Sequence, residues 1–403
     1  MGKFFVACVF LGLGACGTAY QDNPELIDLS NQPVTYTGAP TVILGRVQAL
    51  ADGTKRLSWA GTTIHTRFTG NSITANMKVV NGKPANFYQV ALDGNITEVR
   101  AVDGSSASQT FNAPPGDGPH ELSLTKLNEA MDGELIFGGF TPADGGSLLP
   151  TRTLSGRRIE FIGDSITCGY GNEGVITTKM LTSSTDASKN SQRSCKAFLG
   201  KEVYEVSNAY LAFGSQVARS FDADWRLICW SGKGVYRNAD NTTTDLMPDV
   251  YGRSVATDSS TAYDLSSWIP QAVVINLGTN DFGSVAQADV GGKPDEAKFK
   301  ANYIKLVKQV RKAYPSAWIL LTTGPMLSDF FPVTFKALTT MRQNINEIIG
   351  ELNDDRVQFF EFPLNVASDV DATGCEWHPD VDQHTSMAVK LETALQQYLG
   401  WKH

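Results

Sequence analysis

The stretch IEFIGDSITCGYGNEG, residues 159–174, opens with a short apolar run and continues through a glycine, an aspartate and a serine. An apolar run of this length bounded by turn residues is typical of a buried strand. Gly163 and Asp164 favour a turn into a helix, which places Ser165 at the carboxyl end of that strand. The same residue types also cap ordinary strand-to-helix turns, so the chemistry of Ser165 depends on what surrounds it.

The chain after Ser165 repeats this rhythm of strand and helix. Four further apolar runs follow: RLICW (226–230), AVVINLG (272–278), WILLTTG (318–324) and VQFFEF (357–362). Residues 295–314 and 334–352 have apolar side chains at helical spacing, and 385–399 predicts a final helix. This alternation predicts an α/β domain over residues 157–403, with a parallel sheet covered by helices on both faces. Ligands of such sheets bind at the carboxyl ends of the strands.

Residues 24–141 follow a different pattern. Short segments of alternating apolar and polar residues, such as TIHTRF (63–68) and HELSLTKL (120–127), are separated by glycine, asparagine and aspartate. This spacing predicts an antiparallel β-sandwich of the jelly-roll kind. Residues 142–156 are rich in proline, glycine and threonine and lack periodicity, which indicates a linker. The predicted fold class is therefore an N-terminal jelly-roll β-sandwich followed by the C-terminal α/β domain.

The composition excludes some classes of partner. The chain has 403 residues, 42% of them hydrophobic and 19% charged, which is typical of globular protein and enough for two domains. The net charge is -8 and the pI is near 5.2. Nucleic-acid binding needs a basic surface that neutralises phosphates, so we expect no nucleic-acid partner.

The first sixteen residues, MGKFFVACVFLGLGAC, contain one lysine, an apolar run and then small residues. The run is too short to span a bilayer, and this order is typical of a secretory signal peptide over residues 1–16. Its end, residues 13–16, resembles a bacterial lipobox, in which the cysteine is lipidated. We therefore expect either a cell-envelope lipoprotein, with Cys16 as its only membrane anchor, or a secreted protein. A buried apolar first strand is the third interpretation.

Four cysteines remain after this segment: Cys168, Cys195, Cys229 and Cys375. An even count in an exported chain indicates one or two disulfides, and four cysteines allow three pairings that the sequence does not distinguish. No CxxC pair is present, which argues against a zinc site.

Two further strand ends carry residues that can stabilise negative charge. Ser231-Gly232-Lys233-Gly234 follows the second apolar run, and its glycines let backbone N–H groups approach an oxyanion. Gly278-Thr279-Asn280-Asp281 follows the third, and Asn280 is an uncharged side-chain donor at the same edge of the sheet. Such a donor binds an oxyanion without the desolvation cost of a buried charge.

A serine nucleophile needs a base that is neutral near pH 7, and histidine is the usual one. The five histidines are His65, His120, His378, His384 and His403. The first two belong to the sandwich and the last is the C-terminus. His378, in Cys375-Glu376-Trp377-His378-Pro379, follows the last strand and is the preferred base. His384 begins or caps the final helix and remains the alternative.

The order GDS, SGKG, GTND and WHP at successive strand ends resembles the SGNH hydrolase superfamily. With a jelly-roll domain ahead of it, and with GDSITCGYGNEG, WSGKG, GTNDF and WHP, the chain resembles carbohydrate esterase family two. That resemblance implies removal of acetyl groups from xylan- or glucomannan-type polysaccharides without metal or organic cofactor. It also implies that Ser165 is the nucleophile and His378 the base. The Ser165 N–H, Gly232 and Asn280 would form the oxyanion hole.

The resemblance departs from the superfamily at one position. An aspartate usually precedes the histidine by three residues, and here that residue is Cys375. Glu376, Asp380 and Asp382 are candidates for orienting the imidazole. The alternative is a Ser–His dyad like that of some family members, in which a backbone carbonyl orients the histidine.

Three aromatic residues beside the motifs, Tyr170, Trp230 and Trp377, are candidates for stacking on sugar rings, although Trp230 ends a buried strand and core packing explains it equally well. Two other functions are compatible with the sequence. One is an envelope esterase acting on peptidoglycan acetyl or lipid esters. The other is a non-catalytic carbohydrate-binding protein, which the presence of Ser165, Asn280 and His378 disfavours.

Overall fold

The computed structural model describes residues 36, 38–82, 85–104, 108–116, 118–152, 154–184, 193–283, 294–331, 335–364 and 372–402. The predicted signal segment 1–16, including Cys16, lies outside these residues. No helix within the described ranges has the length and apolar character needed to cross a bilayer.

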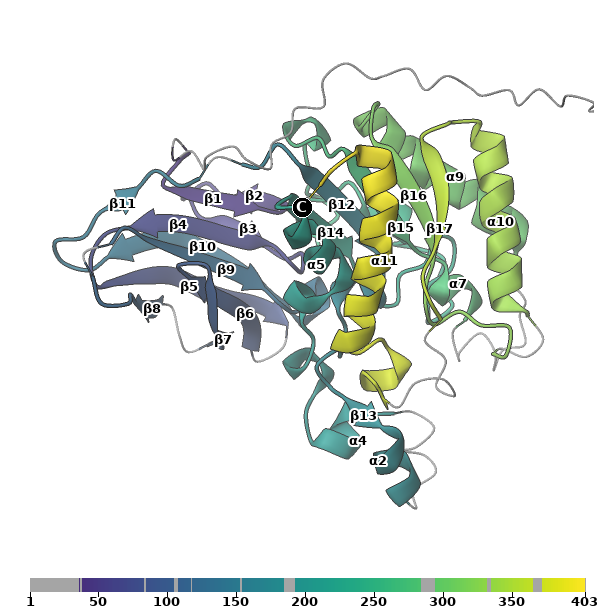
Figure 1. The fold of residues 1–403 in the computed structure, drawn as a ribbon, viewed down its shortest axis with the longest axis horizontal. Coiled ribbons are helices and arrows are strands. Elements are labelled where there is room, and N and C mark those ends of the chain that lie inside the picture. Colours follow the sequence, from purple (N-terminus) through teal and green to yellow (C-terminus); the bar gives the residue numbers. More distant parts are fainter. Residues whose placement is uncertain are drawn as a thin grey trace, which may run out of the picture.

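The N-terminal domain is a sandwich of two antiparallel sheets, seen beside the α/β domain in Figure 1. One sheet has the order β1-β4-β9-β6-β7, with β11 pairing to β4, and the other has the order β2-β3-β10-β5-β8. Their inward side chains form one apolar core between the sheets. The strand bounds are β1 Thr41–Leu44, β2 Val47–Ala49, β3 Lys55–Leu57, β4 Thr63–Phe68, β5 Ser72–Gly82, β6 Ala85–Leu92, β7 Asn95–Asp103, β8 Ser108–Asn112, β9 His120–Lys126, β10 Gly133–Pro142 and β11 Leu148–Leu149.

The predicted linker differs from the structure. Residues 142–156 were expected to be without periodic structure, but β10 extends to Pro142 and β11 lies within the segment. Leu148 and Leu149 pair with Phe68 and Arg67 of β4, which makes this segment part of the sandwich. Two residues are too short a run to show any periodicity, and their pairing with a strand far away in sequence is what makes them a strand.

The C-terminal domain contains the predicted parallel sheet, in the order β14-β12-β15-β16-β17. Its strands are β12 Arg158–Gly163, β14 Asp224–Cys229, β15 Ala272–Asn276, β16 Trp318–Thr323 and β17 Val357–Glu361. The long helices are α5 Phe213–Ser220, α9 Glu296–Ala313, α10 Ala337–Leu352 and α11 Val381–Leu399. On β15, Val273 and Ile275 join the core with α9 and α10, whereas Ala272 and Val274 join the core with α5 and α11. Successive strand side chains therefore face opposite helix layers.

The remaining described elements are short. They are α1 Ser165–Cys168, α2 Thr178–Ser183, α4 Cys195–Leu199, α6 Met247–Val250, α7 Thr279–Phe282, the two-stranded β13 Ile176–Thr177 with β18 Ala372–Thr373, and the 3-10 turns η1 Ala130–Asp132, η2 Val203–Glu205, η3 Ala209–Leu211, η4 Leu265–Ser267 and η5 Cys375–Trp377. In Figure 1, β13, α2 and α4 form a small lobe that projects from the α/β domain.

The final helix begins earlier than predicted. It was expected over residues 385–399 with His384 at its start, but α11 begins at Val381 because the Asp380 side chain accepts a hydrogen bond from the Gln383 N–H. His384 therefore lies inside the helix, fully buried, where its Nδ1 accepts from the Phe213 N–H at 3.2 Å. Its role in this position is structural.

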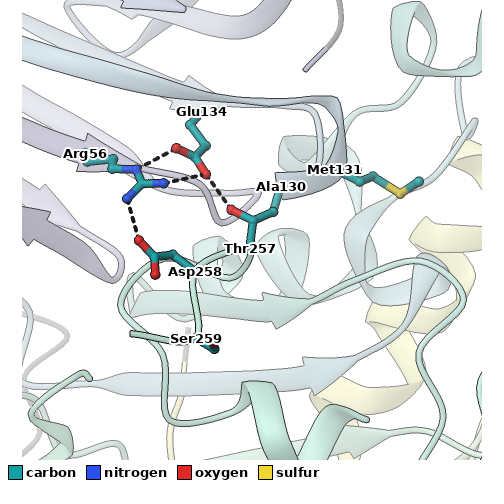
Figure 2. Close-up of a pocket in the computed structure, with 7 residues that line it drawn as sticks. All are labelled: Arg56, Ala130, Met131, Glu134, Thr257, Asp258 and Ser259. Atoms are coloured by element: carbon teal, nitrogen blue, oxygen red, sulfur yellow. Dashed lines mark hydrogen bonds and ion pairs between the residues drawn. The ribbon is translucent and has the colours of Figure 1, made fainter. Parts of the chain in front are cut away.

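The two domains share a polar interface. Arg46 of the sandwich is fully buried and pairs with Glu160 of β12 at 3.1 Å, and Glu160 also accepts from the Tyr251 hydroxyl at 2.8 Å. A second contact surrounds a cavity of about 350 Å³ at the boundary. Figure 2 shows Arg56 there between Glu134 of the sandwich and Asp258 of the α/β domain. These pairs fix the sandwich against the sheet.

Candidate active site

Ser165 is the first residue of α1, directly after β12. Gly163 permits this turn because a Cβ at that position would lie 2.0 Å from Thr167 Oγ1. Asp164 caps the helix, and its carboxylate accepts from the Ile166 N–H at 3.1 Å. A disulfide between Cys168 and Cys229 ties α1 to the end of β14. The serine is thereby held at the carboxyl edge of the sheet.

His378 contacts this serine. Its Nε2 lies 2.8 Å from Ser165 Oγ, within hydrogen-bond distance for proton transfer. Its Nδ1 lies 3.0 Å from the Cys375 carbonyl and 3.1 Å from the Glu376 carbonyl. A carbonyl only accepts, so Nδ1 carries the proton and Nε2 is free to accept one from the serine. Burial removes water from the charged imidazole and lowers the pKa of His378 to about 4, although the two carbonyl hydrogen bonds act to raise it. The ring is therefore neutral at pH 7.

The carboxylate candidates for orienting His378 are not its partners among the described residues. The Glu376 carboxylate accepts from the Tyr170 hydroxyl at 2.9 Å, and Asp380 caps α11. Asp382 is exposed in the first turn of α11. The prediction of a carboxylate orienter is therefore wrong for Glu376 and Asp380, whose carboxylates bind elsewhere, and the carbonyl alternative describes the observed contacts.

The loop before His378 is bent and covalently fixed. Glu376 and Trp377 both have left-handed backbone conformations, with φ of +52° and +68°. Cys375 is fully buried and forms a disulfide with Cys195 of α4. The Cys375 N–H also donates to the Gly171 carbonyl at 3.0 Å. These constraints aim two carbonyl groups at the imidazole, and strained backbone of this kind is held only where surrounding contacts determine it.

The predicted oxyanion donors lie on the neighbouring strand ends. Gly232 follows β14 with φ of +77°, a conformation that glycine adopts without steric cost. No described residue accepts a hydrogen bond from its N–H. The Asn280 side chain, in α7 after β15, donates to the Lys233 carbonyl at 2.9 Å and lies 3.4 Å from Asp164. Ser165 supplies the first N–H of α1, and helix N-terminal N–H groups lack intrahelical partners.

Asp281 holds the segment that follows the Ser231–Gly234 turn, the turn that carries the Gly232 N–H. Sequence reasoning missed this role. Asp281 is fully buried and accepts from the backbone N–H groups of Val235, Tyr236 and Arg237 at 2.9–3.1 Å. Desolvation raises the pKa of Asp281 to about 6 even against these hydrogen bonds. The GTND motif contains this residue, but only the folded loop shows which N–H groups it binds.

The three aromatic candidates lie in different environments. The Tyr170 ring is 4.5 Å from the His378 ring, centroid to centroid. Trp377 is 38% exposed, and the Arg193 guanidinium lies 4.3 Å from the centre of its ring. Trp230 packs against the apolar core and has the Lys233 ammonium 4.6 Å from its ring centre. Tyr170 therefore packs against the histidine of the dyad. Trp377 is a solvent-accessible ring that directly precedes His378 in the chain, and Trp230 is mainly a packing residue.

Comparisons with known proteins agree with this architecture. A family model for the carbohydrate esterase 2 N-terminal domain matches residues 43–151, and one for the GDSL-like lipase/acylhydrolase family matches residues 161–386. The solved structure of a family two carbohydrate esterase from Clostridium thermocellum, in complex with cellohexaose, is 31% identical to the chain. The TM-score is 0.75, and the match covers 90% of this chain and 100% of that one.

The chain belongs to carbohydrate esterase family two. A family two enzyme of Corynascus thermopiles, solved with a carbohydrate binding domain, is 30% identical with a TM-score of 0.75, over 90% of this chain and 100% of that one. An acetylxylan esterase / glucomannan deacetylase of Cellvibrio japonicus is 28% identical, over 92% of this chain and 88% of that protein. Cellulase/esterase CelE of Acetivibrio thermocellus is 31% identical over 86% of this chain, but the match covers only 38% of that relative's length.

Family membership confirms two predictions. The two-domain fold is that of a family two carbohydrate esterase, and the chain is a carboxylic ester hydrolase. Within the described ranges, no group of three or more histidine, cysteine, aspartate or glutamate side chains is arranged to hold a metal ion.

Proposed function

We propose that this family two esterase hydrolyses acetyl esters on polysaccharides such as xylan or glucomannan, using Ser165 as nucleophile and His378 as base. The observation that carries the proposal is the 2.8 Å contact between Ser165 Oγ and a His378 Nε2 that has no proton of its own. The names of the Cellvibrio relative and the cellohexaose complex of the Clostridium relative support an acetylated polysaccharide as substrate.

The mechanism follows from the proton arrangement at this dyad. His378 Nε2 takes the Ser165 proton as Oγ attacks the acetyl carbonyl carbon. The N–H groups of Ser165 and Gly232 stabilise the oxyanion, and the Asn280 amide joins them by exchanging its long 3.4 Å contact with Asp164 Oδ2 for the substrate oxygen. His378 then protonates the departing sugar oxygen. Water attacks the acetyl-enzyme by the same route and releases acetate. The positive charge that forms on His378 is stabilised by the two carbonyls at Nδ1.

Substrate contacts belong to the same proposal. Tyr170 packs against the His378 ring and Trp377 is exposed directly before His378 in the chain; both would stack on a pyranose ring, which orients the ring while leaving its acetyl group free to reach Ser165. We also propose that the chain is exported through the signal segment at residues 1–16, and is then either cleaved and released or retained at the envelope by a lipid on Cys16. The two disulfides support passage through an oxidising compartment.

The decisive experiment is acetate release from acetylated xylan and acetylated glucomannan by the parent chain, with Ser165→Ala and His378→Ala alongside. We expect both substitutions to lower kcat by roughly 10⁴- to 10⁶-fold, because the two residues act as one unit. A parent chain without acetate release, or a Ser165→Ala variant with parental activity, would refute the proposal. The mass of the mature N-terminus separates a lipidated Cys16 from simple cleavage.

A further inference from the structure

One buried carboxylate of the sandwich reaches into the catalytic domain. Glu129 follows β9 and precedes η1, and only 1% of it is exposed. Its Oε2 accepts from the Ser231 N–H at 2.6 Å, and its Oε1 accepts from the Ser231 hydroxyl. Both oxygens of a sandwich residue therefore bind the residue directly before Gly232, the predicted oxyanion donor.

The sandwich holds Glu129 in a fixed position. Its N–H donates to Asp132 Oδ2 at 3.3 Å. Lys126 Nζ donates to the carbonyls of Asn128 and Glu129 at 2.6 and 3.1 Å. Asn128 Nδ2 also crosses the domain boundary, to the Tyr204 carbonyl at 3.0 Å. The carboxylate is thus presented by a rigid segment.

These contacts determine the orientation of one peptide group. The Gly232 N–H belongs to the Ser231–Gly232 peptide. Glu129 anchors Ser231 on one side of this peptide, and the Gly232 carbonyl accepts from the Ala239 N–H at 2.8 Å on the other. The Lys233 N–H also donates to the Trp230 carbonyl at 3.2 Å, which closes a turn around this peptide. Gly232 itself lacks a Cβ and has positive φ, so no side chain of its own adds to these restraints. An oxyanion donor is effective only when it is aimed in advance at the developing charge.

We propose that Glu129 is a positioning residue for ester hydrolysis: the sandwich uses this carboxylate to aim the Gly232 N–H at the oxyanion. The inference rests on the proposed function. It gives the N-terminal domain a part in catalysis besides packing, since the α/β domain supplies the donor and the sandwich supplies its orientation.

The charge on Glu129 matters to this role. The ionised carboxylate accepts from both Ser231 donors. A protonated one still accepts from the Ser231 N–H but donates to the Ser231 hydroxyl, and both contacts lose the strength that the negative charge gives them. Burial raises the pKa of Glu129 to about 7, the Ser231 hydrogen bonds and Lys126 lower it, and Asp132 raises it. Tyr170 is a further titratable group near Glu129, whose negative charge acts to raise the pKa of the Tyr170 hydroxyl. Positioning should therefore be lost as pH falls through 7.

The test compares Glu129→Gln with Glu134→Gln in the full chain, on acetylated xylan. Glu134 is a matched control, because it is a buried interface carboxylate that also binds a hydroxyl, that of Thr257. Its ion-pair partner is Arg56, and it does not contact the Ser231–Gly234 turn. We expect Glu129→Gln to lower kcat about 10- to 100-fold with KM nearly unchanged, less than the 10²- to 10³-fold typical of deleting a donor. Glu134→Gln should keep kcat within about twofold of the parent. Equal kcat for parent and Glu129→Gln would overturn the inference.

The pH profile separates positioning from general destabilisation. We expect the ratio of parent to Glu129→Gln kcat to rise between pH 6 and pH 8, since only the parent carboxylate ionises there. Asp164, whose burial raises its pKa to about 7, is present in both chains and cancels in the ratio. A ratio that stays constant with pH would contradict the inference.

Amide hydrogen exchange of residues 230–234 provides a readout that does not need activity. Exchange should be faster in Glu129→Gln than in both the parent and Glu134→Gln. Unchanged exchange would overturn the inference about Glu129, but the proposed esterase function would stand. A parent chain that releases no acetate would instead refute the proposed function, and the exchange comparison would still test the contact. Should Glu129→Gln fail to fold, Ser231→Ala removes one of the two contacts and is expected to show a smaller loss of kcat in the same direction.

Discussion

At the scale of single residues, the site depends on buried polar groups whose charge the protein controls. His378 is kept neutral by its surroundings, and Asp281 is buried at the centre of three N–H donors. His384, one turn into α11, is buried next to Phe213 with nearly parallel rings. Of these three titratable residues, only His384 has no place in the proposed chemistry. It is therefore suitable for testing how burial affects stability.

Burial and the nearby His378 lower the pKa of His384 to about 3, whereas an unfolded histidine titrates near 6.5. At a pH between these two values the unfolded chain therefore binds a proton at His384, whereas the folded chain does not. The stability contributed by this site is present above pH 6.5 and is lost as pH falls, by about 1.4 kcal/mol per pH unit. We expect the free-energy difference of unfolding between parent and His384→Asn to shrink by about 2–3 kcal/mol between pH 6 and pH 4.

Urea titrations of both chains at several pH values measure this difference. Asparagine retains an acceptor for the Phe213 N–H but does not titrate, so His378 and the other shared groups cancel. A difference that stays constant between pH 6 and pH 4 would show that His384 is not the group responsible.

At the scale of elements, the catalytic loop shows how a disulfide serves where the superfamily usually has an aspartate. Cys375 contributes a carbonyl to His378, and its side chain is bonded to Cys195 on α4 of the small lobe. The carbonyl is held in place through the bond, together with the left-handed residues that follow it. Fixing the tautomer and orientation of the imidazole is the same task that a carboxylate performs in a triad.

Removing this disulfide should therefore reduce activity as well as stability. We expect Cys195→Ala/Cys375→Ala to lower kcat between about 10- and 100-fold, because small misplacements of a catalytic group cost this much. The free energy of unfolding should fall by about 2–4 kcal/mol. Acetate release and urea unfolding measure the two effects.

A rescue variant distinguishes orientation from loss of fold. Cys195→Ala/Cys375→Asp puts a carboxylate three residues before His378, and we expect it to recover part of the kcat that the double alanine variant loses. A double alanine variant with parental kcat would show that the disulfide does not support the histidine.

At the scale of the whole molecule, a buried ion pair joins the two cores. Arg46 and Glu160 have fully buried side chains, and Glu160 also binds the hydroxyls of Tyr251 and Tyr314. The Arg46 guanidinium lies 4.7 Å from the centre of the Tyr251 ring. Glu160 belongs to β12, the strand that leads to Ser165, so the sandwich contacts the α/β domain at this strand as well as at Ser231 after β14.

We expect Arg46→Met to lower the free energy of unfolding by about 3–5 kcal/mol, because it leaves Glu160 buried without its cation. The midpoints of urea unfolding measured by tryptophan fluorescence and by far-UV circular dichroism should shift together, because the ion pair links both domains. Lys196→Met, which breaks the exposed pair with Glu202, is the control and should cost much less. Separate midpoints for the two probes would show that the domains unfold independently.

Local pattern predicted much of this molecule. The parallel sheet follows from five apolar runs, and the stripes of α9 and α10 are buried as their helical spacing indicated. The edge strands are harder to predict: β7 is mostly exposed, and its sequence NITEVRAVD has no regular alternation of apolar and polar residues. Its residues lack alternation because an edge strand with both faces near solvent has little apolar surface to bury.

The sequence by itself therefore determined the strand-and-helix order and placed Ser165, Gly232, Asn280 and His378 at strand ends, since periodicity and turn chemistry are encoded in neighbouring residues. Only the tertiary structure decided which carbonyls orient His378, which cysteines pair and that Glu129 binds Ser231. Glu129 and Ser231 are 102 residues apart, and Cys195 and Cys375 are separated by 180. Such contacts depend on how the domains and loops pack together, which no local pattern specifies.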